Sequence, residues 1–306
     1  MATVITASGL PGILLSDNID DYPEGIILPV DKPYRWTSAD VIRKVKYCAC
    51  RHFHKKNLKV GHAGTLDPLA DGLLIVCIGK ATRMAEEIQR YDKEYVAGVS
   101  FGATTPSYDL EKEIDRFYPT DYVSADSIAE TLRSFLGRQE QVAPLFSAKS
   151  VDGIRAYELA RKQWKTAKDN PGMPFDHSAT ESLSRQEIEI KEIELLSFRP
   201  GGGTSSENTG CHISETSDTQ TSSEKASIDP RSLRINVTDN SRYNLPHADI
   251  RVLCSKGTYI RALARDIGEA LGTGAHLDML RRTRNGGFDV RDAVKVEDAV
   301  RLFGGK

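Results

Sequence analysis

The sequence lacks the features that would place the chain in a membrane or outside the cell. No apolar run approaches the length of a membrane span, and the N-terminus has no charged stretch followed by an apolar one, as a signal peptide would. The five cysteines are odd in number and irregularly spaced, which is atypical of a disulfide framework. These absences favour a chain that folds in the reducing cytoplasm.

A metal site is poorly supported as well. Cys48, Cys50, His52 and His54 are close in sequence, but alternate residues on a helix point about 200° apart and cannot share one ion. Structural zinc sites use two ligand pairs that are well separated. We therefore expect no metal, with Cys48 in the core and the two histidines at the surface.

Acidic residues are absent between Asp40 and Asp67, where seven basic residues fall. The net charge of −2 alone argues against a polyanionic partner, but local patches set the affinity for nucleic acid. An acid-free stretch lacks the i,i+4 partners of an ordinary solvated helix face, so we favour a nucleic-acid surface over a solvated face. The basic residues are Arg43, Lys44, Lys46, Arg51, Lys55, Lys56 and Lys59, and a second cluster contains Arg281, Arg282 and Arg284.

Hydrophobic periodicity predicts an α+β fold, because strands and helices mix without regular βαβ alternation and without an internal repeat. The expected sheet is mixed and mostly antiparallel, with flanking helices. Helices are predicted over 39–50 (capped by Thr37 or Ser38), 81–90, 124–136, 155–165, 258–271, 277–284 and 296–303. Strands are predicted over 25–30, 73–79, 94–102, 188–198, 233–237 and 250–254, and a strand and turn over 148–153.

Two segments lack such a pattern. Residues 1–24 have no sustained period and are expected to be flexible. Residues 201–230 are rich in Ser, Thr and Glu and contain no aromatic residue, so they cannot bury enough apolar area to offset their chain entropy. We predict a disordered insert there, within a hairpin formed by the strands at 188–198 and 233–237.

The most informative stretch is the loop at residues 61–72, Gly-His-Ala-Gly-Thr-Leu-Asp-Pro-Leu-Ala-Asp-Gly. Its glycines and proline indicate a loop, and an apolar run that reads as a buried strand follows it. Asp67 is therefore an exposed carboxylate on a rigidly placed loop. It can be a turn former, a metal ligand or a catalytic group, and the last role needs partners elsewhere in the chain.

Two further stretches could supply those partners. In residues 254–261, a strand end, a glycine turn and a helix start bring backbone N–H groups and cations together, which suits an anion. Arg261 lies in the first helical turn, where acids are favoured, so it indicates a partner carboxylate or phosphate; an unpaired surface arginine is the alternative. Tyr95 begins a strand, where tyrosine is commonly a packing residue with a wet hydroxyl.

In chain order, Asp31-Lys32-Pro33, the loop at 61–72, Asp92-Lys93-Glu94-Tyr95 and the stretch ending in Arg261 together resemble the pseudouridine synthases of the bacterial TruB type. The resemblance runs from Gly25 to Phe288 and is interrupted by residues 201–230. It implies an isomerase that converts a uridine in the T-loop of tRNA, expected at position 55, to pseudouridine by base flipping. The reaction changes no oxidation state and consumes no water, so no cofactor is expected.

The resemblance also implies roles for nine residues. Asp67 would be the catalytic carboxylate, attacking the target nucleotide or taking its proton, and Arg261 would hold it by a salt bridge. Tyr95 would stack on the flipped base and take part in proton transfer. The remaining residues would bind RNA: Tyr259 and Leu280 in the base pocket, His62 inside the T-loop, Lys32 in support of the pocket, and Arg83 and Arg281 on the RNA.

The resemblance implies a catalytic domain over 25–290 and a short helical tail over 291–306, in place of the further RNA-binding domain that many relatives have. The expected partner is the T stem-loop of tRNA, and we expect a monomer with no obligate protein partner and no membrane. The sequence departs from the family pattern at Asp71, at Arg35 and Trp36, and at Pro106, although Asp109 follows Pro106.

Two other functions fit parts of the sequence. An RNA-binding or tRNA-folding protein would use the same basic surfaces without the chemistry. A nucleoside hydrolase would need a second acid that activates water, for which Asp71 and Asp109 are the candidates. The joint presence of Asp67, Tyr95 and Arg261 favours the isomerase.

Overall fold

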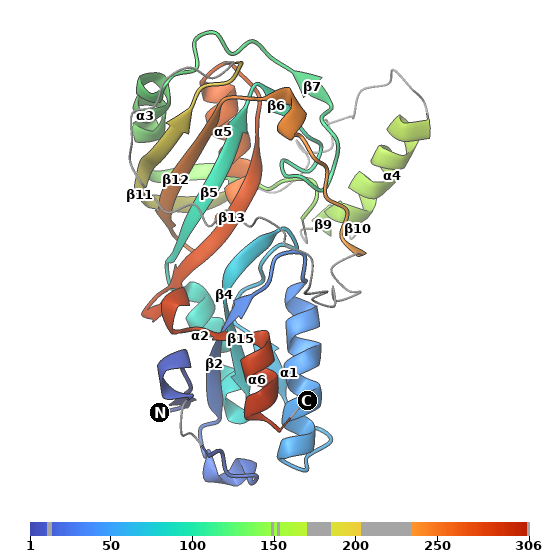
Figure 1. Cartoon of the computed structure of the whole chain (residues 1–306), viewed down its shortest axis with the longest axis vertical. Coiled ribbons are helices and arrows are strands. Elements are labelled where there is room, and N and C mark those ends of the chain that lie inside the picture. The colour runs from blue at the N-terminus through green and yellow to red at the C-terminus, as the bar shows by residue number, and fades with distance from the viewer. Residues whose placement is uncertain (11–13, 148–149, 152–153, 170–184, 203–233, 305–306) are drawn as a thin grey trace, which may run out of the picture.

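One large sheet dominates the computed structural model, which describes residues 1–10, 14–147, 150–151, 154–169, 185–202 and 234–304 (Figure 1). The strand order is β1-β2-β4-β13-β5-β12-β11-β8, with β3 on β4, β14 on β13 and β15 on β2. The pairs β1–β2, β15–β2 and β13–β4 are parallel, and the other pairs are antiparallel. The predicted α+β fold with a mostly antiparallel sheet is confirmed.

The elements of the described residues have the following bounds. The strands of the large sheet are β1 (Thr3–Val4), β2 (Ile26–Lys32), β3 (Val60–His62), β4 (Ala70–Ile78), β5 (Lys93–Phe101), β8 (Gly137–Val142), β11 (Arg185–Arg199), β12 (His247–Cys254), β13 (Ala275–Asn285), β14 (Phe288–Asp289) and β15 (Val294–Lys295). Two small pairs are β6 (Ala103–Thr104) with β7 (Arg116–Phe117) and β9 (Ser150–Val151) with β10 (Ile154–Arg155). The α-helices are α1 (Ser38–His52), α2 (Ala85–Arg90), α3 (Ala125–Ser134), α4 (Ala156–Asp169), α5 (Ile260–Ala270) and α6 (Val296–Leu302). Short 3-10 turns are η1 (Ala7–Gly9), η2 (Ile19–Asp21), η3 (Gly79–Met84), η6 (Ser241–Tyr243) and η7 (Val290–Asp292).

The sheet has two halves that meet at one short seam. β1 to β4 and β15 lie with α1 and α6, whereas β5, β8 and β11 to β13 lie with α3 and α5 (Figure 1). At the seam, β4 pairs with β13 only through Ala70, Asp71 and Gly72, opposite Leu280, Arg281 and Arg282. A Cβ atom on Gly72 would lie 2.4 Å from the carbonyl oxygen of Arg282, so only glycine permits this approach.

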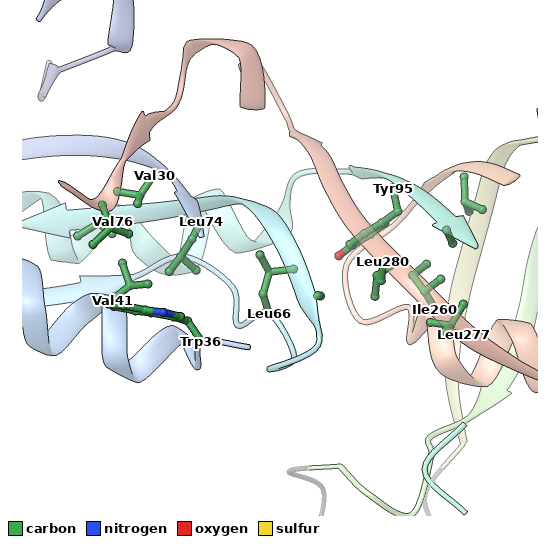
Figure 2. Close-up of a cluster of buried hydrophobic side chains, with 14 of the residues drawn as sticks. Val30, Trp36, Val41, Leu66, Leu74, Val76, Tyr95, Ile260, Leu277 and Leu280 are labelled. Atoms are coloured by element: carbon green, nitrogen blue, oxygen red, sulfur yellow. The ribbon is translucent and has the colours of Figure 1, made fainter. Parts of the chain in front are cut away.

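Buried apolar side chains continue across the seam (Figure 2). Val41 and Trp36 pack against β2 and β4 on one side, and Tyr95, Leu277, Leu280 and Ile260 lie on the other. Leu66, from the loop before β4, lies between the two groups and is 3% exposed. This loop is thereby fixed to the core of both halves, because burying a leucine side chain contributes about 1.5–3 kcal/mol.

The predicted helix at 277–284 is wrong, since these residues belong to β13. The register shifts between Leu277 and Met279, so Asp278 is an extra residue in the strand. The bulge puts Leu277 and Leu280 on the same buried face although they are three positions apart. Three-residue spacing is a helical signal, which explains the error.

The predicted hairpin around the insert is also wrong where it can be examined. Residues 234–237 form no strand, and β11 pairs with β12 and with β8, a strand that was not predicted. Residues 203–230 of the predicted insert lie outside the described residues. Residues 1–24 were expected to be flexible, but β1 pairs with β2, and Ile5 and Ile19 are 1% and 8% exposed.

The ends of α1 follow the sequence closely. Thr37 is its N-cap, and Thr37 and Asp40 form a reciprocal capping box. Cys48 faces the core as predicted. His52 is half-buried and donates a 3.0 Å hydrogen bond from Nε2 to the Ser16 carbonyl oxygen, whereas His54 is exposed. Among the described helices, none combines the length and the apolar content that crossing a membrane requires.

Candidate active site

The loop that carries Asp67 connects β3 to β4 and is pinned from several sides. The Ser38 hydroxyl at the start of α1 donates to the Leu66 carbonyl oxygen at 3.1 Å and accepts from the Leu66 N–H at 2.9 Å. The guanidinium of Arg282 donates to the Gly64 carbonyl oxygen at 3.1 Å. Asp67 itself closes a turn, because its carbonyl oxygen accepts from the Ala70 N–H. The carboxylate therefore projects from a fixed backbone.

Arg261 is the predicted partner of Asp67. Its Nε and Nη2 atoms donate to the two carboxylate oxygens of Asp67 at 2.9 and 3.1 Å, a bidentate pair. Arg261 is 5% exposed, whereas the side chain of Asp67 is 38% exposed. Its remaining donors reach the carbonyl oxygens of Ser107 and Phe146. The alternative of an unpaired surface arginine is excluded.

Asp109 is a second carboxylate beside Arg261. Its Oδ2 atom lies 3.7 Å from Arg261 Nε, and Oδ1 accepts from the Ser107 hydroxyl at 2.6 Å. Burial raises the pKa of Asp109, while the charge of Arg261 opposes that rise. Burial alone would lower the pKa of Arg261, but the charges of Asp67 and Asp109 raise it above its ordinary value. Arg261 is therefore a permanent cation that bridges the two acids.

A cleft of about 690 Å³ opens over this pair, large enough for a nucleotide. It lies between the Asp67 loop, the start of β5, the loop before α5 and the seam. Five of the nine residues named from the sequence line it: Asp67, Tyr95, Tyr259, Arg261 and Leu280. Phe146, Lys93, Lys256 and Arg282 line it as well, so the cleft combines apolar walls with several cations.

Both tyrosines of the cleft are partly or fully buried. Tyr95 is 8% exposed, and burial raises its pKa, with the charge of Arg282 opposing the rise. Tyr259 is the N-cap of α5, where its backbone N–H donates to Gln141 Oε1 at 2.9 Å. Burial also raises the pKa of Tyr259. Both rings present an apolar face together with a protonated hydroxyl at neutral pH.

Lys32 and His62 lie near the cleft without lining it. Lys32 is fully buried, its ammonium donates to the carbonyl oxygens of Pro33 and Trp36 at 3.0 and 2.5 Å, and burial lowers its pKa to about 8. It supports the backbone after β2. His62 ends β3, and burial lowers its pKa. Its Nδ1 atom is buried and has no hydrogen-bond partner among the described atoms.

Arg83 and Arg281 are not brought into the cleft. Arg83 is exposed on η3 and lines a separate groove of about 450 Å³ with Lys55, Lys59 and Lys80. Arg281 binds Asp31 at 3.1 Å and Asp71 at 2.9 Å. Asp71, which departs from the family pattern, is thus paired with Arg281. RNA phosphates that bind Arg281 would have to compete with the carboxylates of Asp31 and Asp71.

The sequence analysis did not predict the contacts that three residues make at the site. Ser38 was considered only as a helix cap, Arg282 only as one of a basic cluster, and Lys93 only as part of a motif. A buried arginine or lysine gives no local pattern by which it differs from a surface one.

The departures from the family pattern at Arg35 and Trp36 have structural accounts. Trp36 fills the core beneath β2, and Arg35, at a φ of 62°, donates to the Ile235 carbonyl oxygen at 2.7 Å.

No group of three His, Cys, Asp or Glu side chains in the described part of the chain is arranged as metal ligands.

The chain matches two family descriptions. Residues 51–220 match "TruB family pseudouridylate synthase (N terminal domain)", which covers more than half of the chain, and residues 261–303 match "tRNA pseudouridylate synthase B C-terminal domain". The second match begins at Arg261, inside the range predicted for the catalytic domain.

Curated relatives support the same family, and a solved structure shares the fold. Proteins named tRNA pseudouridine synthase B from Phocaeicola vulgatus and Deinococcus radiodurans are 44% and 34% identical, over 90% and 89% of this chain and 92% and 77% of theirs. A chain of a Cbf5-Nop10-Gar1 complex shares the fold with a TM-score of 0.54 at 24% identity. That alignment covers 95% of this chain and 59% of the chain from the complex, so this chain spans a little more than half of that chain's length. The chain therefore belongs to the TruB family of pseudouridylate synthases.

Proposed function

We propose that the chain isomerises one uridine in the T-loop of tRNA, at position 55, to pseudouridine. The family makes it an isomerase. The curated relatives named tRNA pseudouridine synthase B support tRNA as the substrate. The single observation that carries the proposal is the bidentate Asp67–Arg261 pair in the lining of a nucleotide-sized cleft.

Asp67 is the catalytic carboxylate of the proposed mechanism. The reaction breaks an N-glycosidic bond and forms a C-glycosidic bond to the same base, and an ionised carboxylate can attack the nucleotide or take its proton. Aspartate is ionised at neutral pH. Arg261 fixes both carboxylate oxygens, so that the group meets the substrate in one orientation.

The target base must leave its stack to reach Asp67, at a cost of a few kcal/mol. Stacking on Tyr95 can recover about 1–3 kcal/mol, and Tyr259 and Leu280 supply the remaining walls of the pocket. His62, at the end of β3, would contact the nucleotides that close over the vacated position. Tyr95 also takes part in proton transfer at the base.

Other residues act further from the base. Lys32 supports the pocket through the backbone carbonyl oxygens that it binds, and Arg83 contacts RNA phosphates outside the cleft. Arg281 also contributes to RNA binding. We propose that residues 25–290 form the catalytic domain, followed by a tail at 291–306, and that the chain works as a cytoplasmic monomer without a cofactor.

A nucleoside hydrolase has less support. It needs a second carboxylate that activates water, but Asp71 is bound to Arg281, and Asp109 is buried against Ser107 and Arg261. An RNA-binding protein without activity would not need the Asp67–Arg261 geometry.

The test uses T stem-loop RNA with tritium at uridine C5. Tritium leaves C5 only when carbon replaces nitrogen at the sugar. The wild type should release it, whereas Asp67→Asn, which keeps the side-chain volume and removes the charge, should lower the rate by about 10³-fold or more. RNA affinity of the variant should stay within about 3-fold, because the pocket walls are unchanged.

Asp249→Asn is the matched control, since Asp249 lies on β12 and binds Ser197 outside the cleft. It should release tritium like the wild type. Tight RNA binding by the wild type without release would favour the RNA-binding protein. Release of free uracil would favour the hydrolase.

A further inference from the structure

Arg282 is a buried cation at the wall of the cleft. Its side chain is 1% exposed, and it is the largest of the fully buried side chains. Nε donates to the Leu73 carbonyl oxygen at 2.7 Å, and Nη2 donates to the Gly64 carbonyl oxygen at 3.1 Å. No described carboxylate lies within ion-pair distance of it, in contrast to Arg261 and Arg281. Its positive charge therefore remains unneutralised.

A buried guanidinium without a carboxylate is costly, so the position calls for an explanation beyond packing. Arg282 lies directly opposite Tyr95 in the pairing of β13 with β5, which places the two side chains next to each other on the same face. Burial raises the pKa of the Tyr95 hydroxyl, and the charge of Arg282 opposes that rise. One cation thus binds the Asp67 loop and β4 and lies beside Tyr95 in the sheet.

The charge of Arg282 acts on the groups around it. Burial lowers the pKa of Lys93 to about 8, and Arg282 adds to that decrease. Burial lowers the pKa of His62 in the same way, again with a contribution from Arg282. A field that disfavours neighbouring cations favours a neighbouring anion, and the Tyr95 hydroxyl is the neighbour that can become one.

We propose that Arg282 is the positioning residue of Tyr95: it fixes the hydroxyl at the base in the cleft and stabilises negative charge on its oxygen. In the proton transfer, the Tyr95 hydroxyl first loses its proton to solvent in the cleft, and the phenolate oxygen then takes the proton from uracil C5. The C5–H bond breaks, its electron pair restores the ring double bond, and an O–H bond forms, which returns Tyr95 to its protonated form. This inference rests on the proposed function.

The test compares Arg282→Gln, which keeps a donor and loses the charge, with Arg282→Lys, which keeps the charge. Single-turnover tritium release from the C5-labelled T stem-loop should fall about 10²-fold or more in Arg282→Gln. Arg282→Lys should recover at least about 10-fold of that loss. The affinity for the RNA should stay within about 3-fold in both, because Arg282 acts on Tyr95 and not on RNA binding.

Coupling to Tyr95 separates positioning from a merely structural role. In a Tyr95→Phe background, Arg282→Gln should cost less than about 3-fold, since the hydroxyl that it serves is gone. Replacing Tyr95 by a fluorotyrosine, whose phenol is more acidic, should partly rescue Arg282→Gln. In the profile of rate against pH, the rise on the acidic side reports the pKa of the group that acts as the base. This rise should move to higher pH in Arg282→Gln, which loses the positive charge beside Tyr95, and stay in place in Arg282→Lys.

Arg265→Lys is the matched control. Arg265 is also buried and donates to a carbonyl oxygen, that of Val142, but it does not line the cleft. It should leave the rate unchanged. If Arg282→Gln does not fold, Arg282→Lys with and without the fluorotyrosine gives the same comparison.

An equal loss in the Tyr95→Phe background, or a loss confined to RNA affinity, would overturn the inference. Absence of tritium release from the wild type would instead overturn the proposed function.

Discussion

Asp71 and Arg281 face each other across the seam between β4 and β13, with 2.9 Å between Oδ1 and Nη1. Arg281 also reaches Asp31 of β2, so one side chain ties three strands together. The next residue, Arg282, points to the opposite face and ties the Asp67 loop to the same seam. Two consecutive arginines therefore fasten both faces of the junction on which the site is built.

Replacing Asp71 by threonine should affect RNA binding more than folding. The side chains of Asp71 and Arg281 are 33% and 35% exposed, so losing the pair should lower the free energy of unfolding by less than about 1 kcal/mol. Arg281 keeps one carboxylate and gains net charge, and the affinity for T stem-loop RNA should rise about 2–5-fold at low salt. Filter binding over a range of salt concentrations should show the gain vanish as salt increases. An equal gain in Asp126→Thr, on distant α3, would point to bulk charge instead.

Arg261→Lys should separate catalysis from binding. Lysine keeps the charge but cannot hold both oxygens of Asp67, so kcat should fall by about 10²–10³-fold. RNA affinity should change by less than about 3-fold. The melting temperature should also fall, because the carbonyl oxygens of Ser107 and Phe146 lose a donor. Steady-state kinetics and a melting curve test this, and an unchanged kcat would contradict it.

Lys32 should make stability increase with pH above neutrality. Burial lowers its pKa from 10.5 to about 8, and between these values the unfolded chain holds a proton that the folded chain has released. The free energy of unfolding should then rise with pH, by at most about 1.4 kcal/mol per pH unit for one group. The difference in urea unfolding between the wild type and Lys32→Met isolates this contribution. A difference that is flat between about pH 8 and pH 10 would show that Lys32 keeps an ordinary pKa.

The bulge residue Asp278 should stabilise the fold most in mild acid. It accepts hydrogen bonds from His247 at 3.1 Å and from Ser100 at 2.6 Å. The hydrogen bond to Asp278 raises the pKa of His247 above 6.5, so that stability is present below this pH and is lost as pH rises through the folded value. Burial would raise the pKa of Asp278, but its hydrogen bonds lower that pKa below 3.8 in the folded state. The stability that the Asp278 carboxylate contributes is therefore present above pH 3.8 and is lost as pH falls through the folded-state pKa.

Asp278→Asn should therefore cost more stability at about pH 5.5 than at about pH 8.5. Urea unfolding at the two pH values measures the difference, and His247→Gln should remove the pH dependence. An equal cost at both would show that the pair is neutral throughout.

The sequence predicted the elements with local signals. Thr37, one of the two caps considered, marks the start of α1, and the apolar run after Gly72 marks β4. A cation in the first turn of a helix is unfavourable without a nearby anion, so the position of Arg261 predicted a partner carboxylate or phosphate. The family resemblance then identified Asp67 as that partner, and the structure pairs the two residues. Where a bulge disguised the two-residue period, at Asp278, the same reasoning predicted a helix in place of β13.

By itself, then, the sequence determined the family, the mostly antiparallel α+β fold and the pairing of Asp67 with Arg261, since these depend on contiguous motifs and on local periodicity. Only the tertiary structure decided which cations belong to the cleft. Arg281, Arg282 and Arg284 look alike in the chain, yet the pairing of β13 with β4 and β5 turns the first toward Asp31 and Asp71 and buries the second beside Tyr95. The physical reason is that strand register, which long-range pairing sets, determines the face on which each side chain lies.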